Sequence, residues 1–188
     1  MSFTEKDKKR LVELQTLNSM CDRLNLSQED LLELEALKKK RNANFDEVER
    51  PKHYNNHPSG VESIDINEYL DYCLGCVWKY TMRFRDKGTP LKDLKKGLWY
   101  AQRSQAQGHS RILQVSESMD IEYKVESYVK SVVIAEPDTR AKDIFNSIYV
   151  ISRKHPEAEV YCREKYAILT GGISELIQEW ENKNGKEN

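Results

Sequence analysis

Residues 72 to 88 constrain this chain most, because they combine a helical hydrophobic pattern with a row of cations. Lys79, Arg83 and Lys87 recur at a spacing of four, so an amphipathic helix would carry them on one face. Aromatic side chains, among them Tyr80, stand beside them. A nucleotide is both anionic and aromatic and would suit such a face. A solvated basic face over buried aromatics explains the spacing equally, and spacing alone favours that reading.

Composition sets the limits on fold and partners. The 188 residues allow one domain with extensions or two small domains, and 32% of them are charged. The formal net charge of -1 argues against bulk nucleic-acid binding but permits a local basic pocket. No run approaches the ~20 apolar residues of a membrane span, and the first residues lack the apolar core of a secretion signal. We therefore expect a cytoplasmic protein, with no membrane contact, whose four cysteines are reduced thiols.

Hydrophobic periodicity predicts a mainly α fold in three parts: an N-terminal helical arm (1–42), a helical core (43–110) and a C-terminal helical region (111–188). In the arm, leucines repeat at helical spacing, and Ser27 is placed to cap a second helix. Such a leucine-rich pair is typical of packing or of oligomerisation, so a homo-oligomer is expected.

The sequence of the C-terminal region is compatible with more than one secondary structure. Alternation at 121–125 would fit a short strand, whereas the valines that follow favour a helix, and helix is our prediction. A further helix is predicted from Pro137 to about residue 155. Gly171-Gly172 is predicted to end the next helix, with a last helix over 173–180.

Residues 43–61 read as a loop that contains His53 and His57, followed by Glu62 and Asp65. Two carboxylates three residues apart can hold a hydrated divalent metal or accept a proton, and they can equally be ordinary acids of a first helical turn. The latter reading is favoured by spacing alone.

A turn at 88–90 would fold the next helix back against the first. The cations of both helices, Lys96 included, would then converge and could offset phosphate charge. The sequence has neither a Walker-type phosphate loop nor a Gly-x-Gly-x-x-Gly motif. A structural zinc on His53, His57, Cys73 and Cys76 is a weaker alternative, because both cysteines lie in an apolar helical run.

Several blocks in order resemble a small family of phage nucleotide kinases. The family pattern is Pro-x-His-Tyr, Gly-x-Glu-x-Ile-Asp, Gly-Asn-x-x-Lys-Tyr-x-x-Arg and Asp-Leu-x-Lys-Ala-x-x-Tyr. The matching positions here are Pro51, His53, Tyr54, Gly60, Glu62, Asp65, Gly75, Lys79, Tyr80, Arg83, Lys87 and Asp93. The resemblance covers roughly residues 48 to 105, a little under a third of the chain.

The resemblance implies an enzyme that moves a phosphoryl group from a nucleoside triphosphate to a deoxynucleoside monophosphate, such as dGMP or dTMP, without a phosphate loop. It also implies the cytoplasm of an infected bacterial host as its location. The residues assigned to catalysis are His53, Glu62, Asp65 and Arg83, and Glu62 and Asp65 would hold Mg²⁺. The residues assigned to the nucleotide and its phosphates are Lys52, Tyr54, Lys79, Tyr80, Lys87, Asp93 and Lys96.

The chain departs from the pattern at three places. Cys76 stands where the family has Asn, Phe84-Arg85 replaces a small pair, and Gly97 replaces Ala. A thiol cannot make the hydrogen bonds of an amide, so these departures keep two alternatives open. One is a nucleotide-binding protein without turnover that sequesters a nucleotide and counters a host defence. The other is a module that binds a host or phage protein.

Overall fold

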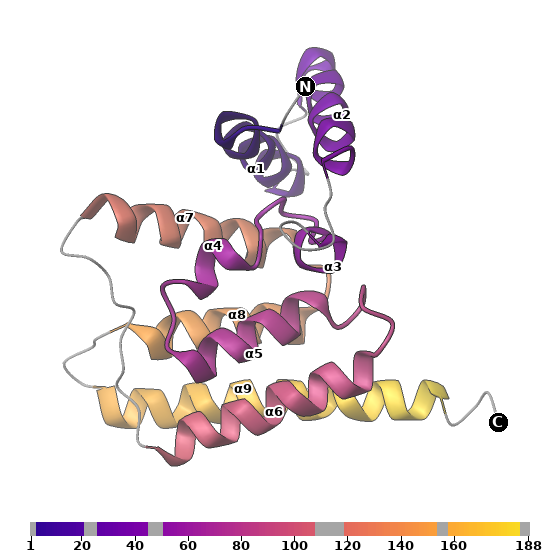
Figure 1. Cartoon of the computed structure of the whole chain (residues 1–188). Helices are drawn as coiled ribbons and strands as arrows, with labels where there is room; N and C mark the ends of the chain where they lie inside the picture. Colours follow the sequence, from indigo (N-terminus) through magenta and orange to yellow (C-terminus); the bar gives the residue numbers. More distant parts are fainter. Residues whose placement is uncertain (1–2, 21–25, 45–50, 108–118, 154–157, 185–188) are drawn as a thin grey trace.

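The computed structural model describes residues 3–20, 26–44, 51–107, 119–153 and 158–184. These residues form nine helices and no strand, so the predicted mainly α fold is confirmed (Figure 1). The segment at 121–125 is helical, and the short strands allowed for the C-terminal region do not occur in its described residues. The helices are α1 Glu5–Met20, α2 Gln28–Asn42, α3 Lys52–Asn55, α4 Ile64–Asn67, α5 Tyr72–Arg83, α6 Pro90–Ala106, α7 Met119–Ala135, α8 Thr139–Ser152 and α9 Ala158–Asn184.

Helix α5 lies at the centre of the fold. Its first turn is capped by Asp71, whose Oδ1 accepts the backbone N–H groups of Cys73 at 2.8 Å and Leu74 at 3.1 Å. All of its residues from Cys73 to Met82 except Lys79 are buried. Trp78, which is fully buried, packs on Phe145 of α8 with ring centroids 4.5 Å apart. The helix therefore supplies the core against which α6 and α8 pack.

Helices α6, α8 and α9 complete this core. Helix α9 packs along both α8 and α6. Helix α5 packs against the same two helices (Figure 1). One cluster of buried side chains runs from Val12 in α1 through α5 to Ile177 in α9. The predicted core segment and the predicted C-terminal region thus share one hydrophobic interior, while the boundary expected at residues 110–111 lies outside the described residues.

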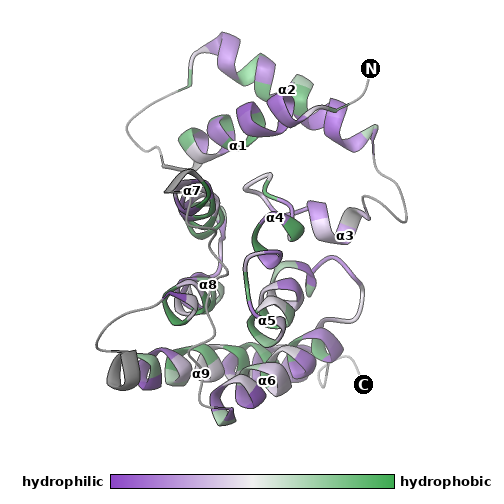
Figure 2. Ribbon diagram, turned by 60° about the vertical axis from the view of Figure 1, so that its left-hand side comes forward, coloured by the Kyte–Doolittle hydropathy of each residue, from purple (hydrophilic) through white to green (hydrophobic). Residues whose placement is uncertain are grey.

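Helices α1 and α2 form a pair at one end of the molecule (Figures 1 and 2). Their facing leucines make a second, smaller buried cluster, which consists of Leu11, Leu14, Leu34 and Leu37. Ser27 caps α2 as predicted, since its hydroxyl accepts the Asp30 N–H at 3.1 Å. These four leucines pack within the chain, so an oligomer would have to use other surfaces; the homo-oligomer stays a prediction.

The predicted helix stop at Gly171-Gly172 is wrong. Helix α9 runs without interruption from Ala158 to Asn184, and neither glycine has a positive φ. A Cβ built on Gly172 would lie 3.3 Å from Ile144 of α8. Gly172 therefore serves the close approach of α8 to α9 rather than a turn.

Phe84 and Arg85 join the end of α5 to the C-terminal helices. Phe84 is fully buried, and its ring meets that of Trp180 in α9 edge to face at 6.4 Å. Arg85 Nη2 lies 2.9 Å from Glu136 Oε1, just beyond α7. Phe84-Arg85, where the chain departs from the kinase-like pattern, thus adds contacts between the end of α5 and the segment from Glu136 to α9.

We expect Phe84→Ala to lower the free energy of unfolding by about 3–5 kcal/mol, because it empties a fully buried aromatic site. Urea denaturation followed by circular dichroism measures this. The matched control is Leu32→Ala, since Leu32 on α2 is 69% exposed. An equal, small effect of both substitutions would show that Phe84 does not fasten the C-terminal helices.

Candidate functional site

A buried ion pair organises the end of α5. Arg83 is 4% exposed; its Nε donates to Asp93 Oδ2 at 2.8 Å and its Nη2 to Asp93 Oδ1 at 3.0 Å. Its Nη1 donates to the Tyr54 hydroxyl of α3. The turn with Gly88 at φ +74° reverses the chain, so that α5 and α6 run antiparallel as predicted (Figure 1). Because Asp93 is 1% exposed and bound by Arg83, it is not accessible to a ligand for direct contact.

Cations converge around Tyr80 on this α5–α6 pair. The distances to the Tyr80 ring centroid are 4.8 Å for Arg83 Cζ, 5.0 Å for Lys79 Nζ and 5.7 Å for Lys96 Nζ. Within the described residues, neither lysine forms an ion pair with a carboxylate. The predicted convergence of cations from two helices is therefore present, and of these cations Arg83 is paired with Asp93, whereas Lys79 and Lys96 have no carboxylate partner among the described side chains.

Lys87 joins this cluster from the turn after α5. Helix α5 ends at Arg83, so Lys87 lies beyond the helical face that carries Lys79 and Arg83, and its N–H bonds back to the Arg83 carbonyl at 3.1 Å. Partial desolvation and the charge of Arg83 lower the pKa of Lys87, as do Lys96 and Lys79, while the Asp93 carboxylate opposes them. That electrostatic coupling places Lys87 in the same positive field. We call Lys79, Lys87 and Lys96 with Arg83 the cation cluster.

His53 of α3 borders the cation cluster. Its ring contacts that of Tyr54 at a centroid distance of 4.3 Å. Partial burial and the positive charges of Lys87 and Arg83 lower the pKa of His53 below 6.5. This shift favours the neutral imidazole, which can both donate and accept a hydrogen bond. The Lys52 side chain, a predicted phosphate ligand, lies outside the described residues.

A cavity of about 330 Å³ opens between α3, α4 and the cation cluster. Its walls combine apolar and polar side chains: Pro51, Tyr54, Asn55, Glu62, Ser63, Ile64, Asn67 and Lys79. The amide oxygens of Asn55 and Asn67 are buried without a hydrogen-bond partner. The volume lies at the lower end of the range of small-molecule sites, and Lys79 connects the cavity to the cation cluster.

Glu62 and Asp65 face a lysine of α1. Lys8 Nζ lies 2.5 Å from Asp65 Oδ1 and 3.7 Å from Glu62 Oε1, and Asp65 Oδ2 accepts the Glu62 N–H at 2.8 Å. The two carboxylates are therefore close together, as their spacing predicted, but an ammonium lies beside both. Within the described residues, no group of three or more His, Cys, Asp or Glu side chains is placed to hold a metal. The Mg²⁺ assignment stays a prediction, in which the ion would compete with Lys8.

Three residues of the zinc alternative, Cys73, Cys76 and His57, are buried, and His57 is bonded to other side chains. Cys73 and Cys76 are free thiols buried in α5. His57 Nδ1 lies 2.8 Å from the Ser59 hydroxyl, and its Nε2 lies 3.2 Å from Glu136 Oε2. These contacts account for both ring nitrogens of His57.

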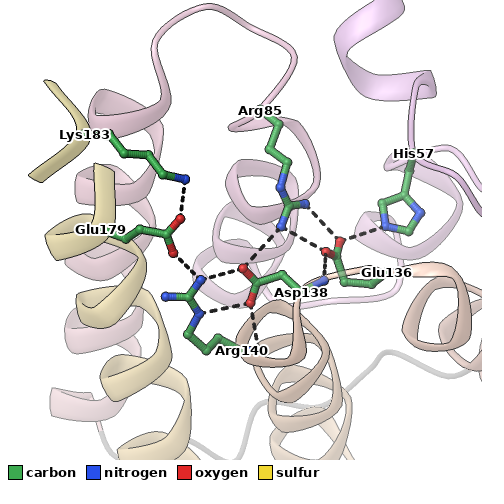
Figure 3. Close-up of polar contacts among 7 residues, drawn as sticks. All are labelled: His57, Arg85, Glu136, Asp138, Arg140, Glu179 and Lys183. Carbon is green, nitrogen blue, oxygen red and sulfur yellow. Dashed lines mark hydrogen bonds and ion pairs between the residues drawn. The ribbon is translucent and has the colours of Figure 1, made fainter. Parts of the chain in front are cut away.

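Glu136 is the main residue that the sequence reasoning missed. Its side chain is fully buried. Its carboxylate oxygens contact His57 Nε2 and both Arg85 Nη atoms, and they accept a hydrogen bond from the Asp138 N–H (Figure 3). Burial raises the pKa of Glu136, but the hydrogen bonds from His57 and Asp138 and the charge of Arg85 outweigh it and lower the pKa overall. From Asp138 the network continues through Arg140 to Glu179 and Lys183 of α9 (Figure 3). A single Glu before a proline carries no recognisable motif, so sequence offered no signal for it.

The comparisons with known proteins bear on this same part of the chain. A family model described as a protein of unknown function (DUF3310) matches residues 48–102, a little under a third of the chain. This segment contains α3 to most of α6, and with them the cation cluster and the cavity. No curated protein and no solved structure shows significant similarity to the chain. Among the described residues, no helix combines the length and apolar character that crossing a bilayer requires.

We expect Asp93→Ala to lower the free energy of unfolding by about 3–5 kcal/mol, because it leaves the buried Arg83 charge without its carboxylate. Asp86→Ala is the control, since Asp86 is exposed and accepts only a bond from Asn56 among the described groups. Chemical denaturation of both variants gives the two values. Equal losses of unfolding free energy in the two variants would mean that the Arg83–Asp93 pair does not stabilise the fold.

The pKa of His53 should rise when a phosphate-bearing ligand enters the cation cluster. In the free protein the neighbouring cations depress this pKa, and a bound anion would offset them. By linkage, phosphate affinity should then increase as the pH falls through the His53 titration. NMR titration of the His53 ring, with and without dTMP, tests this. An unchanged His53 pKa in the saturated protein would place the phosphate elsewhere.

Proposed function

We propose that this chain binds a nucleotide with its phosphates on Lys79, Lys87 and Lys96. The observation that carries the proposal is the cation cluster, whose lysines have no described carboxylate partner and which adjoins a cavity of about 330 Å³. Ammonium groups in this arrangement offset phosphate charge. Tyr54, which lines the cavity, is a better candidate to stack on the base than Tyr80, which is 9% exposed beneath the cations.

In this proposal Arg83 is a positioning residue. Asp93 and Tyr54 hold its guanidinium, so it keeps α3, α5 and α6 in register beneath the phosphates. Because the Asp93 carboxylate offsets the Arg83 charge, the lysines supply the net positive charge of the site. His53, whose neutral form is favoured, would donate a hydrogen bond to a phosphate oxygen.

The activity that we propose is phosphoryl transfer from a nucleoside triphosphate to a deoxynucleoside monophosphate. An oxygen of the acceptor phosphate forms a bond to the γ-phosphorus while the bond to the β–γ bridging oxygen breaks, which yields two diphosphates. This chemistry depends mainly on positioning and on charge compensation, so it does not require a phosphate loop. Where the triphosphate arrives with Mg²⁺, Glu62 is the predicted carboxylate that lines the cavity.

The second candidate is nucleotide sequestration without turnover. It uses the same contacts, and it is favoured by Cys76, which is 6% exposed in α5 at the position where the resembling kinases have Asn. A protein-binding module, a host or phage partner and the cytoplasm of an infected bacterium also remain predictions. The kinase assay and the binding measurement below separate these candidates.

We expect Lys79→Ala and Lys96→Ala each to weaken dTMP or dGMP binding about tenfold, because each removes a charged hydrogen bond to phosphate. Lys95→Ala is the matched control: Lys95 neighbours Lys96 on α6 but pairs with Glu181 at 2.7 Å. Calorimetry measures binding, and conversion of monophosphate to diphosphate with ATP and Mg²⁺ measures turnover.

The outcomes of these measurements are distinct. Binding with diphosphate formation supports the kinase, and binding without product across donors and metals supports sequestration. Absence of any nucleotide binding in the native protein would overturn both and leave the protein-binding module. Equal affinities of the Lys79, Lys95 and Lys96 variants would contradict the proposed phosphate site.

A further inference from the structure

The outer surface of α6 carries a stripe of exposed cations and one exposed tryptophan. Lys92, Lys96, Trp99 and Arg103 follow at spacings of four, three and four, so they lie along one side of the helix. Trp99 is 54% exposed. At the start of α5, Tyr72 is 75% exposed and adds a second accessible ring. Large aromatic side chains left in water at one place mark an interaction surface.

The aromatic rings of this surface are in mutual contact. Tyr100 stands at the centre: its ring centroid is 4.8 Å from that of Trp99, 5.8 Å from that of Tyr72 and 6.0 Å from that of Tyr80. Arg103 Cζ lies 5.4 Å from the Trp99 ring centroid. A continuous aromatic ladder thus leads from the cation cluster around Tyr80 outward to the exposed rings of Trp99 and Tyr72. We call this surface the α6 ladder.

The charge of the α6 ladder is uncompensated by described carboxylates. Lys92, Lys96 and Arg103 form no ion pair with any described residue, whereas Lys95, on another side of the same helix, pairs with Glu181. Asp71 at the start of α5 is the described acid near this end, and its Oδ1 caps the helix. A surface on which cations alternate with aromatic rings is complementary to a partner in which anionic groups alternate with flat rings.

We propose that the α6 ladder binds a short single-stranded oligonucleotide. Phosphodiesters would lie on Lys92, Lys96 and Arg103, while bases would stack on Trp99 and Tyr72, as in other single-strand sites. From Lys92 to Arg103 the helix rises about 16 Å, which is roughly the length of five phosphates in a stacked strand. This surface exceeds what one nucleotide needs. The proposal goes beyond the mononucleotide site, with which it shares only Lys96, and requires no phosphoryl transfer.

The test is fluorescence anisotropy of labelled ten-nucleotide oligo(dT) on the full chain. We expect binding that weakens with salt and exceeds the affinity for dTMP. Trp99→Ala and Tyr72→Ala should each weaken oligo(dT) binding about tenfold, because each removes a stacked base. Both variants should leave dTMP binding by calorimetry unchanged. Leu32→Ala, an exposed apolar side chain of α2, is the matched control and should bind normally.

Three results would overturn the proposal. The first is oligo(dT) bound no more tightly than dTMP, and the second is equal binding by the Trp99 and Leu32 variants. The third is a change in sedimentation of Trp99→Ala from dimer to monomer with unaltered oligo(dT) binding, which would assign the surface to a second copy of the chain. Trp99→Phe keeps a ring and should retain binding, which separates loss of stacking from loss of folding. Arg103→Ala should reduce the slope of log affinity against log salt by about one.

Discussion

The burial of Arg83 is the constraint on which this structure depends. A guanidinium that is 4% exposed must be paired, because an isolated buried charge is strongly destabilising. Asp93 supplies the pair from the first turn of α6, and Tyr54 completes it from α3. Three elements separated by loops are thereby held in one arrangement. Because Arg83 uses Asp93, this acid is not available to the lysines above it, and the field around Tyr80 stays positive.

The departures from the kinase-like pattern fall at two different kinds of position. Phe84 and Arg85 contact Trp180 and Glu136, so they belong to the attachment of α7–α9 rather than to the nucleotide site. Both contacts are made with residues beyond the matched segment. Cys76 is different, since it is buried within α5 itself and changes what that helix offers. In the kinase proposal, Cys76 is therefore the departure that bears on turnover, because Phe84 and Arg85 have a structural role.

Features that depend on neighbouring residues were predictable, and features that depend on distant ones were not. The Ser27 cap, the turn at Gly88 and the helices on either side of it follow from local patterns. The continuity of α9 through Gly172 depends on the approach of α8, which no local pattern reports. Likewise, periodicity placed Lys79 and Lys96 near each other, but nothing in the sequence joined Glu62 and Asp65 to Lys8, or His57 to Glu136. Local propensity determines the elements, and tertiary contacts determine which of their charges are paired.

Because some charges are paired and others are not, different parts of the cavity wall differ in charge. Glu62, Asn55 and Asn67 line it together with Lys79, which leads to the cation cluster. A ligand that carries phosphate at one end and hydrogen-bond donors at the other would be oriented by these groups before any further contact forms. The cation cluster and the α6 ladder share one residue, Lys96. A chain with a net charge of -1 can thus present local positive charge at the cation cluster, because the buried acids nearest the core are paired with other cations, namely Lys8, Arg83 and Arg85.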